Sequence, residues 1–233
     1  MVTTTEAKVV AISPLTDRIL LLMLEPDTYI EYQAGQYLQL FSDDQWVSYS
    51  IANAPLGAKH YELHIRHDPQ NQTTQRLIAD IKEQGRVMLQ LPFGDCHVNQ
   101  LAPLLPIIFI AGGTGFAPIK AMIEHLLVEG EQRNTTLYWC VKGRSDLYLS
   151  GMVEQWQEHI SHFHYHPLIS ENGSKEDLMK LLIQTYDDKL TVCQYVIGGP
   201  FDMVYSVRDA LLEVGVQRDH LYSDAFAFEE KKG

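Results

Sequence analysis

The sequence is short of cysteine, and this shortage excludes several classes of protein. Its three cysteines, Cys96, Cys140 and Cys193, are far apart and form no CxxC pair. A zinc ribbon, a disulfide framework and any other cysteine-based metal site are therefore not expected. A Cys₄ iron–sulfur cluster needs four thiolates, which this chain cannot supply. We expect no resident metal.

Positive charge and long hydrophobic runs are also scarce. The formal net charge is −12, which opposes binding to nucleic acid and to anionic membranes because both are negatively charged. No apolar run approaches the roughly 20 residues that cross a bilayer. The N-terminus "MVTTTEAKVV" lacks the basic and apolar regions of a signal peptide. We therefore expect no nucleic-acid partner, no membrane association and a cytoplasmic location.

The chain contains enough apolar residues to form a hydrophobic core. With 233 residues, of which 45% are hydrophobic, one or two folded domains are expected. The first hundred residues carry short apolar runs separated by turn signals, and residues 60–67 alternate apolar and polar side chains as a half-buried strand does. This spacing predicts a small antiparallel barrel or sandwich. The predicted strands are 8–13, 18–24, 36–41, 49–55, 60–67 and 86–94, with a helix at 73–85.

The pattern changes after residues 99–106, where two prolines mark a domain boundary. Beyond it, apolar runs alternate with helical ones, which predicts a doubly wound parallel sheet. We therefore assign residues 1–100 to a β-barrel domain and residues 106–233 to an α/β domain. The predicted strands are 107–111, 136–141, 163–168 and 193–199, and the helices are 116–129, 152–159, 174–186 and 203–215.

Glycines gather where the first strand of the second domain ends. Gly112, Gly113 and Gly115 lie between strand and helix, with Thr114 among them. Glycine permits a sharp turn and leaves no side chain in the way of a diphosphate, and a helix start attracts an anion. The sequence "VIGGPFDM", residues 196–203, places a second glycine-containing loop on the same edge of the sheet. Together the loops favour a dinucleotide site over two ordinary turns, although Pro118 replaces the third glycine of GxGxxG.

Five motifs in order, "AGQY", "YSIANAP", "AGGTGFAP", "GGPFDM" and "YSDAFAF", resemble the ferredoxin–NADP reductase superfamily. The resemblance spans residues 35–228 and is strongest to bacterial NAD(P)H:flavin oxidoreductases. It implies a flavin-binding barrel followed by an NAD(P)H-binding α/β domain, with the nicotinamide laid against the flavin ring. It also implies an enzyme that reduces FMN, FAD or riboflavin with NAD(P)H.

The resemblance implies flavin contacts on two strands. The family motif R-x-[YF]-[ST] falls on residues 47–50, so Tyr49 would pack on the flavin and the catalytic Ser50 would hydrogen-bond near its N5 atom. The strand "ELHIR" would line the flavin, and the candidate contacts there are Leu63, His64 and Ile65. For His64, an exposed strand position is an equal alternative.

Two departures from the family pattern concern the flavin phosphate. Val47 stands where the family has an arginine, and valine offers neither charge nor forked hydrogen bonds. The family's Gly-x-x-Ser/Thr segment is also missing near residues 69–77, where Thr73 and Thr74 offer only hydroxyls. Both departures predict a weakly bound flavin that comes and goes as a substrate.

The resemblance implies nucleotide contacts at the edge of the second domain. Arg144 would meet the adenosine end of NAD(P)H, with a surface arginine as the alternative, and Asp224 would lie near the nicotinamide. Gly198 occupies a position where family members often have cysteine. Phe226 or Phe228 could pack over the flavin. The full predicted nucleotide set is Gly112, Gly113, Thr114, Gly115, Phe116, Arg144, Gly199, Pro200 and Asp224.

Three functions stay open at this point. The first is a flavin reductase that passes reduced flavin to an acceptor such as a monooxygenase or ferric iron. The second is a reductase with tightly bound flavin that feeds a separate iron–sulfur or oxygenase partner. The third, suggested by Val47 and Gly198, is a non-catalytic module that keeps the fold. The choice between NADH and NADPH, the preferred flavin and the oligomeric state also stay open.

Overall fold

The chain folds into two compact units. A computed structural model describes residues 1–57, 59–170 and 175–228. The first unit comprises Met1–Asn99 and Lys120–Glu129, and the second comprises Gln100–Ile119 and Gly130–Gly233. The helix α2 (Phe116–Val128) is thus divided, because residues 116–119 make their contacts in the second unit and the later residues in the first.

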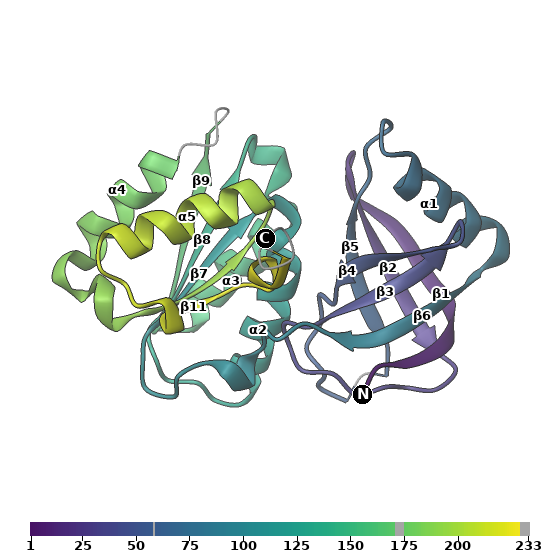
Figure 1. The fold of residues 1–233 in the computed structure, drawn as a ribbon, viewed down its shortest axis with the longest axis horizontal. Helices are drawn as coiled ribbons and strands as arrows, with labels where there is room; N and C mark the ends of the chain where they lie inside the picture. Colours follow the sequence, from purple (N-terminus) through teal and green to yellow (C-terminus); the bar gives the residue numbers. More distant parts are fainter. Residues whose placement is uncertain (58, 171–174, 229–233) are drawn as a thin grey trace. The chain divides into compact units, whose positions relative to one another are not determined.

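The first unit is a six-stranded antiparallel barrel (Figure 1). Its sheet has the order β4-β3-β6-β1-β2-β5, and the two ends of the sheet come together where Ile51 bridges Leu63 and the Ala52 N–H donates to the Glu62 carbonyl at 2.7 Å. The strands are β1 (Thr3–Thr16), β2 (Ile19–Pro26), β3 (Tyr37–Ser42), β4 (Gln45–Ser50), β5 (Tyr61–Arg66) and β6 (Arg86–Phe93).

Alternating apolar residues fill the barrel. Leu38 and Leu40 on β3 and Leu89 and Leu91 on β6 are fully buried, and each is separated from the next by a residue that faces away. The helix α1 (Gln72–Gln84) contacts β3 and β6 and adds further apolar side chains to this core. It begins at Asn71, whose side chain accepts the Thr74 N–H, and it ends at Gly85 with φ +66°.

The second unit is a five-stranded parallel sheet with the order β11-β10-β7-β8-β9. From the first strand, β7, the chain adds β8 and β9 on one side and β10 and β11 on the other. The boundary between β7 and β10 is therefore the point where the winding reverses. The elements are β7 (Ile107–Gly112), β8 (Thr135–Val141), α3 (Ser150–His159), β9 (Phe163–Ile169), α4 (Lys175–Tyr186), β10 (Gln194–Gly198), α5 (Phe201–Glu213) and β11 (Leu221–Tyr222).

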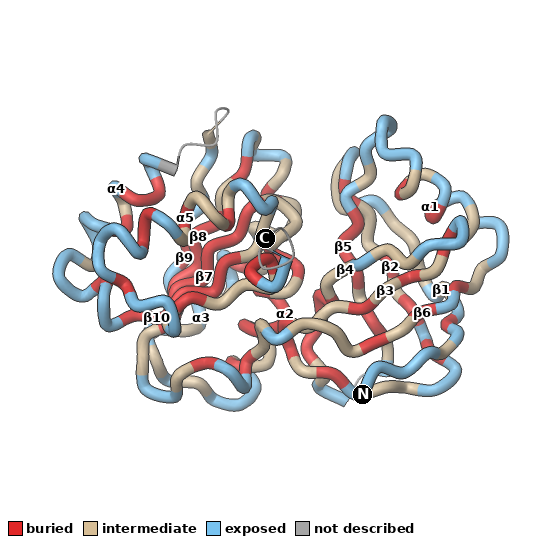
Figure 2. The backbone as a smooth tube through the Cα atoms, in the orientation of Figure 1, coloured by how far each residue is buried: buried red, intermediate tan, exposed pale blue. Residues whose placement is uncertain are grey.

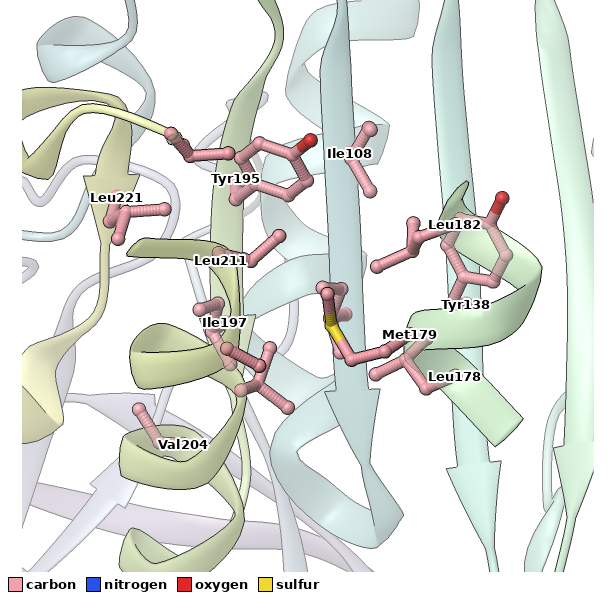
Figure 3. Packing of buried hydrophobic residues seen from close by; sticks show 14 of the residues in the cluster. Ile108, Tyr138, Leu178, Met179, Leu182, Tyr195, Ile197, Val204, Leu211 and Leu221 are labelled. Atoms are coloured by element: carbon pink, nitrogen blue, oxygen red, sulfur yellow. The ribbon is translucent and has the colours of Figure 1, made fainter. Parts of the chain in front are cut away.

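Helices cover both faces of this sheet, so its central strands β10, β7 and β8 are buried along most of their length (Figure 2). On one face, α4 and α5 pack apolar side chains onto β7, β8 and β10, as Figure 3 shows for Leu182 and Leu211. On the other face, Phe116 stacks on Trp139, and Trp156 of α3 meets Phe163 of β9 edge-on. The prediction of a doubly wound parallel sheet is confirmed.

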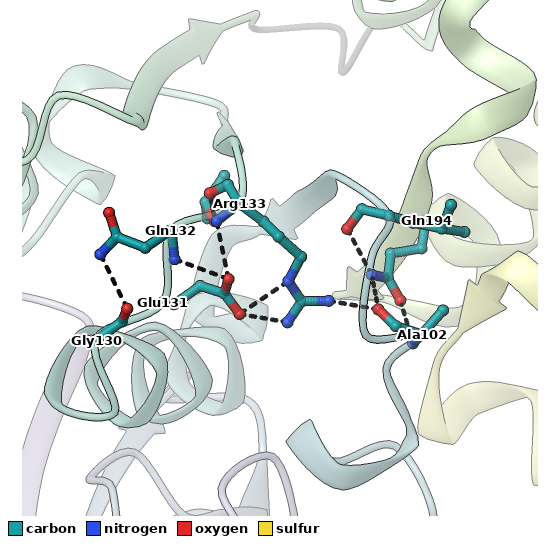
Figure 4. A network of polar contacts seen from close by, with 8 residues as sticks. Ala102, Gly130, Glu131, Gln132, Arg133 and Gln194 are labelled. Atoms are coloured by element: carbon teal, nitrogen blue, oxygen red, sulfur yellow. Dashed lines mark hydrogen bonds and ion pairs between the residues drawn. The ribbon is translucent and has the colours of Figure 1, made fainter.

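A buried polar network fixes the segment that enters the second unit (Figure 4). Gln194, at the amino end of β10, is fully buried; it accepts the Ala102 N–H at 2.8 Å and donates to the carbonyls of Ala102 and Leu105 at 2.9 Å. Arg133 also donates to the Ala102 carbonyl and pairs with Glu131. This network lies at the amino ends of the strands, opposite the glycine loops, and we assign it a structural role.

Several sequence predictions can be compared directly with these elements. The helices predicted at 73–85 and 116–129 match α1 and α2 within a residue or so. The first strand begins at Thr3, earlier than predicted, because residues 3–8 pair with β6. Ser174, the first residue of the predicted helix 174–186, lies outside the described residues. Among the described helices, none has both the length and the apolar character that crossing a membrane requires.

Candidate functional site

The two glycine loops meet at the reversal point of the parallel sheet. Gly112 ends β7 and leads through the turn Gly113–Gly115 into α2, while Gly198 ends β10. A Cβ atom on Gly115 would lie 2.3 Å from the carbonyl carbon and oxygen of Gly198, and a Cβ atom on Gly198 would lie 2.5 Å from the Gly115 oxygen. Because both contacts are with backbone, neither loop accommodates a side chain at these positions.

Gly112 and Gly199 are also close to neighbouring atoms, although less tightly held by backbone than Gly115 and Gly198. A Cβ atom on Gly112 would lie 2.3 Å from the Met203 sulfur and 3.2 Å from the Pro200 Cδ, and one on Gly199, with φ +153°, would lie 3.1 Å from the Gly112 Cα. The sequence suggested that the glycines leave space for a diphosphate. The structure gives an additional reason, since four of them allow the two loops to pack against each other.

Trp139 stabilises the turn Gly113–Gly115. Its indole Nε1–H donates to the Gly113 carbonyl at 3.0 Å, and Gly113 itself has φ +54°. Phe116 stacks on the same indole with ring centroids 3.9 Å apart, and its side chain is fully buried. Phe116 therefore holds the turn in place and does not present its ring at the loop surface. Thr114 is half-buried between the two supported positions.

The other predicted nucleotide residues lie at the same edge of the sheet, beyond the carboxyl ends of its strands. Arg144 follows β8 and is exposed, and Asp224 follows β11 and is half-buried. Phe228 is partly exposed, and its ring lies 5.6 Å from that of Phe201, the residue after Pro200. Phe226, by contrast, is buried, with the Arg218 guanidinium 4.2 Å from its ring centroid.

In the first unit, Tyr49 and Ser50 end the strand β4. Tyr49 lies opposite Leu38 and packs against the barrel core, and burial raises the pKa of its hydroxyl. Ser50 is half-buried and faces the other side, because neighbouring strand residues alternate. A ligand that touches both residues must therefore lie across the end of the strand, next to the Ile51–Leu63 bridge.

The three candidates on β5 divide between its two faces. Leu63 and Ile65 belong to the barrel core, with 0% and 1% exposure, so only their backbone could reach a ligand without rearrangement of the core. His64 faces the other way and is also buried, with its Nε2 atom 2.8 Å from Glu62 Oε1. The alternative that His64 is an exposed strand residue is wrong. Burial lowers the pKa of His64, although Glu62 opposes this effect.

Comparisons with known proteins agree with this arrangement. Residues 109–209 match the family model of the oxidoreductase NAD-binding domain. The chain is 24% identical to the NAD(P)H-flavin reductase of Vibrio harveyi, over 97% of this chain and 99% of that protein. A ferredoxin NADP+ reductase from Neisseria gonorrhoeae, solved with bound FAD and NADP, superimposes with a TM-score of 0.76 at 16% identity and covers 94% of this chain and 97% of its own. These comparisons support a flavin reductase of the ferredoxin–NADP reductase superfamily.

A longer relative has higher identity. The CDP-6-deoxy-L-threo-D-glycero-4-hexulose-3-dehydrase reductase of Yersinia pestis is 32% identical over 213 residues, which are 89% of this chain and 64% of that protein. The chain spans 60–64% of the length of the first five curated relatives that it matches.

The residues of the second unit fit the nucleotide of the superfamily, because the loops at the reversal point bring bare backbone to the start of α2. The barrel fits a flavin less completely. Val47 lies opposite Leu40 and contributes no charge. Thr74 is buried, its N–H is capped by Asn71, and the Thr73 hydroxyl accepts from Gln45 at 3.5 Å. The side-chain groups suited to contact a flavin ring are therefore the aromatic ring of Tyr49 and the hydroxyl of Ser50.

Sequence reasoning missed a group of buried and half-buried titratable residues, which we call the Lys120 cluster: Glu62, His64, Lys120 and Glu124. All four belong to the first unit. The Lys120 ammonium lies 2.8 Å from Glu124 Oε1 and 3.3 Å from Glu62 Oε1. The signal that could have revealed it is a lysine within the apolar face of residues 116–129, with a glutamate four positions later.

Proposed function

We propose that the protein is an NAD(P)H-dependent flavin reductase, which binds NAD(P)H and a flavin, and releases the reduced flavin to an acceptor. The observation that carries the proposal is the contact between the loops at Gly115 and Gly198, at the point where parallel sheets bind their ligands. The near-complete coverage of a flavin reductase of similar length supports it.

In this proposal the second unit holds the nucleotide mainly through its backbone. The turn Gly113–Gly115 and the amino end of α2 face the diphosphate, and Trp139 keeps that turn in place. Gly199, Pro200 and Asp224 lie near the nicotinamide, and Arg144 near the adenosine.

The first unit holds the flavin through its ring. When bound, the flavin supplies the acceptor for the hydride that leaves the nicotinamide C4 atom. Ser50 orients the flavin through a hydrogen bond at N5, and Tyr49 and the backbone of residues 63–65 border the ring. Because the cofactors supply the reactive atoms, the contribution of the protein is positioning, which requires the reacting atoms to be about 3–3.5 Å apart. Val47 leaves the flavin phosphate without a charged partner, so binding is weak.

A second candidate is a reductase that keeps its flavin and passes electrons to a separate protein, such as an iron–sulfur or oxygenase component. The relative from Yersinia pestis favours it, because that protein is named as the reductase of a dehydrase.

The experiment is to purify the protein, desalt it, record its visible spectrum and follow NAD(P)H oxidation with no flavin and with riboflavin, FMN or FAD added. The first candidate predicts a colourless protein that oxidises NAD(P)H only after flavin is added. A yellow protein that retains its flavin and reduces an artificial electron acceptor without added flavin would favour the second. Absence of oxidation with all three flavins and both nucleotides would overturn both.

A further inference from the structure

The Lys120 cluster takes no part in the chemistry proposed above. It does contact the segment that follows Ser50. Lys120 is only 5% exposed, and its ammonium meets three acceptors: Glu62, Glu124 and the Ala52 carbonyl, the last at 3.0 Å. An ammonium has three donors. All three can therefore be satisfied within this cluster, as a buried charge requires.

The segment Ile51–Ala54 is held by contacts on each of its residues. Ile51 N–H donates to the Gln36 carbonyl at 3.1 Å, and Ala52 N–H donates to the Glu62 carbonyl. Tyr32 donates its hydroxyl to the Asn53 carbonyl at 2.7 Å. Two further contacts come from α2, since Lys120 donates to the Ala52 carbonyl and Ala54 N–H donates to Glu124 Oε2 at 3.3 Å.

The two glutamates of the cluster balance the positive charge of Lys120. Burial alone would raise the pKa of Glu62, but the hydrogen bond from His64 and the charge of Lys120 lower it to about 2. Glu62 is therefore ionised at neutral pH, and it also belongs to β5, whose residue Leu63 forms the bridge to Ile51. One buried ammonium thus connects β5 with the segment that follows β4.

We propose that Lys120 is a positioning residue for flavin reduction: by holding the Ala52 carbonyl, it fixes the end of β4 and so the orientation of the Ser50 hydroxyl. This inference rests on the proposed function, because it assigns Lys120 an effect on the flavin. The lysine itself touches neither flavin nor nucleotide. Its loss should therefore alter flavin use without altering nucleotide use.

The test compares Lys120→Met with Lys120→Arg and with Lys180→Met, which removes an exposed lysine from α4. For Lys120→Met we expect a fall of about tenfold in the kcat/KM for flavin, with the KM for NAD(P)H changed less than about twofold, since one charge-assisted hydrogen bond is lost. Lys120→Arg should restore most of the wild-type value, and Lys180→Met should have no effect.

Hydrogen exchange provides a readout that does not depend on activity. In Lys120→Met, a peptide covering residues 49–56 should exchange about tenfold faster, while peptides from β3 and β10 keep their wild-type rates. If Lys120→Met does not fold, the double variant Lys120→Met/Glu124→Gln removes one charge of each sign and keeps an oxygen that can accept the Ala54 N–H.

The outcomes separate the inference from the proposed function. Faster exchange at residues 49–56 in a protein whose wild type reduces no flavin would support the Lys120 contact and reject the function. Unchanged exchange at residues 49–56 would overturn the inference even if the wild type is an active flavin reductase. A uniform increase in exchange across all peptides, with the kcat/KM for flavin falling and the KM for NAD(P)H rising together, would also overturn it.

Discussion

The two units use different parts of the chain for their candidate sites. In the parallel-sheet unit the site is mostly backbone, because glycines at 112, 115, 198 and 199 let two loops pack together. In the barrel unit it depends on side chains, with Tyr49 and Ser50 at a strand end and a buried ammonium behind them. A backbone site depends on the absence of side chains, whereas a side-chain site depends on a supporting set of hydrogen bonds and charges.

The largest effect should come from adding one methyl group to the glycine loops. In Gly115→Ala the new Cβ would lie 2.3 Å from the backbone of Gly198, and backbone cannot rotate away as a side chain can. We expect overpacking to cost about 1–3 kcal/mol of unfolding free energy, and the displaced turn to weaken NAD(P)H binding at least about tenfold. Urea denaturation and nucleotide titration measure the two effects.

The matched control is Gly151→Ala in α3. Within the part of the chain that the structure describes, no atom lies within 4 Å of a Cβ at this exposed position, and alanine favours a helix by about 1 kcal/mol over glycine. The control should therefore be neutral or slightly stabilising and should bind nucleotide normally. Equal nucleotide affinity in the two variants would mean that loop contact does not shape the site.

In the barrel, removal of a single hydroxyl should affect turnover more than folding. Ser50→Ala should lower kcat roughly 10-fold to 100-fold, because one hydrogen bond at the reacting end of the flavin is lost. Stability should change little, since Ser50 is half-buried at the end of its strand. Steady-state kinetics with saturating NAD(P)H measure the effect, and Ser48→Ala, an exposed residue of the same strand, is the control. Full turnover by Ser50→Ala would remove the role assigned to this hydroxyl.

The two units also differ in how far their sites could be predicted from sequence. Glycine pairs at strand ends are visible in a sequence because residue type alone determines the backbone's freedom there, so the loops at 112–115 and 198–200 could be located. The support of Gly113 by Trp139 could not, since it links residues 26 positions apart in sequence through the parallel pairing of β7 and β8.

In the barrel, a smaller part of the candidate site could be predicted from the sequence. Strand alternation at 60–67 predicted β5, and it identified Leu63 and Ile65 as one face. It did not predict that the opposite face is buried as well, because Glu62 and His64 are polar and their cover comes from α2, which lies more than fifty positions later in the chain. Buried charge pairs depend on tertiary contacts, which local periodicity does not reveal.

The smallest effect should be a change of stability with pH. The pKa of Glu62 is about 2 in the folded protein, below its ordinary value of 4.5. The unfolded chain therefore binds more protons between these values, and stability falls as the pH drops from about 4.5 towards 2. Burial also lowers the pKa of His64 from 6.5, so a further loss begins as the pH falls below that value.

Denaturant unfolding from pH 7 to pH 3 measures this dependence. For wild type we expect a loss of about 2 kcal/mol from Glu62 over the acidic part of the range. Glu62→Gln cannot ionise, so its stability should vary less with pH below about 4.5. A variant as acid-sensitive as wild type would show that Glu62 is not the group responsible.

The central claim is that a nucleotide at the glycine loops reduces a flavin held at the barrel strand. The most direct measurement is an anaerobic rapid-mixing experiment with protein, free flavin and NAD(P)H that carries deuterium at nicotinamide C4, in which the loss of flavin absorbance is followed. At subsaturating NAD(P)H the account predicts bleaching far above the protein-free rate, slowed by deuterium, slowed further in Ser50→Ala and slowed at least about tenfold in Gly115→Ala. Bleaching at the protein-free rate, or equal rates in wild type and Gly115→Ala, would contradict it.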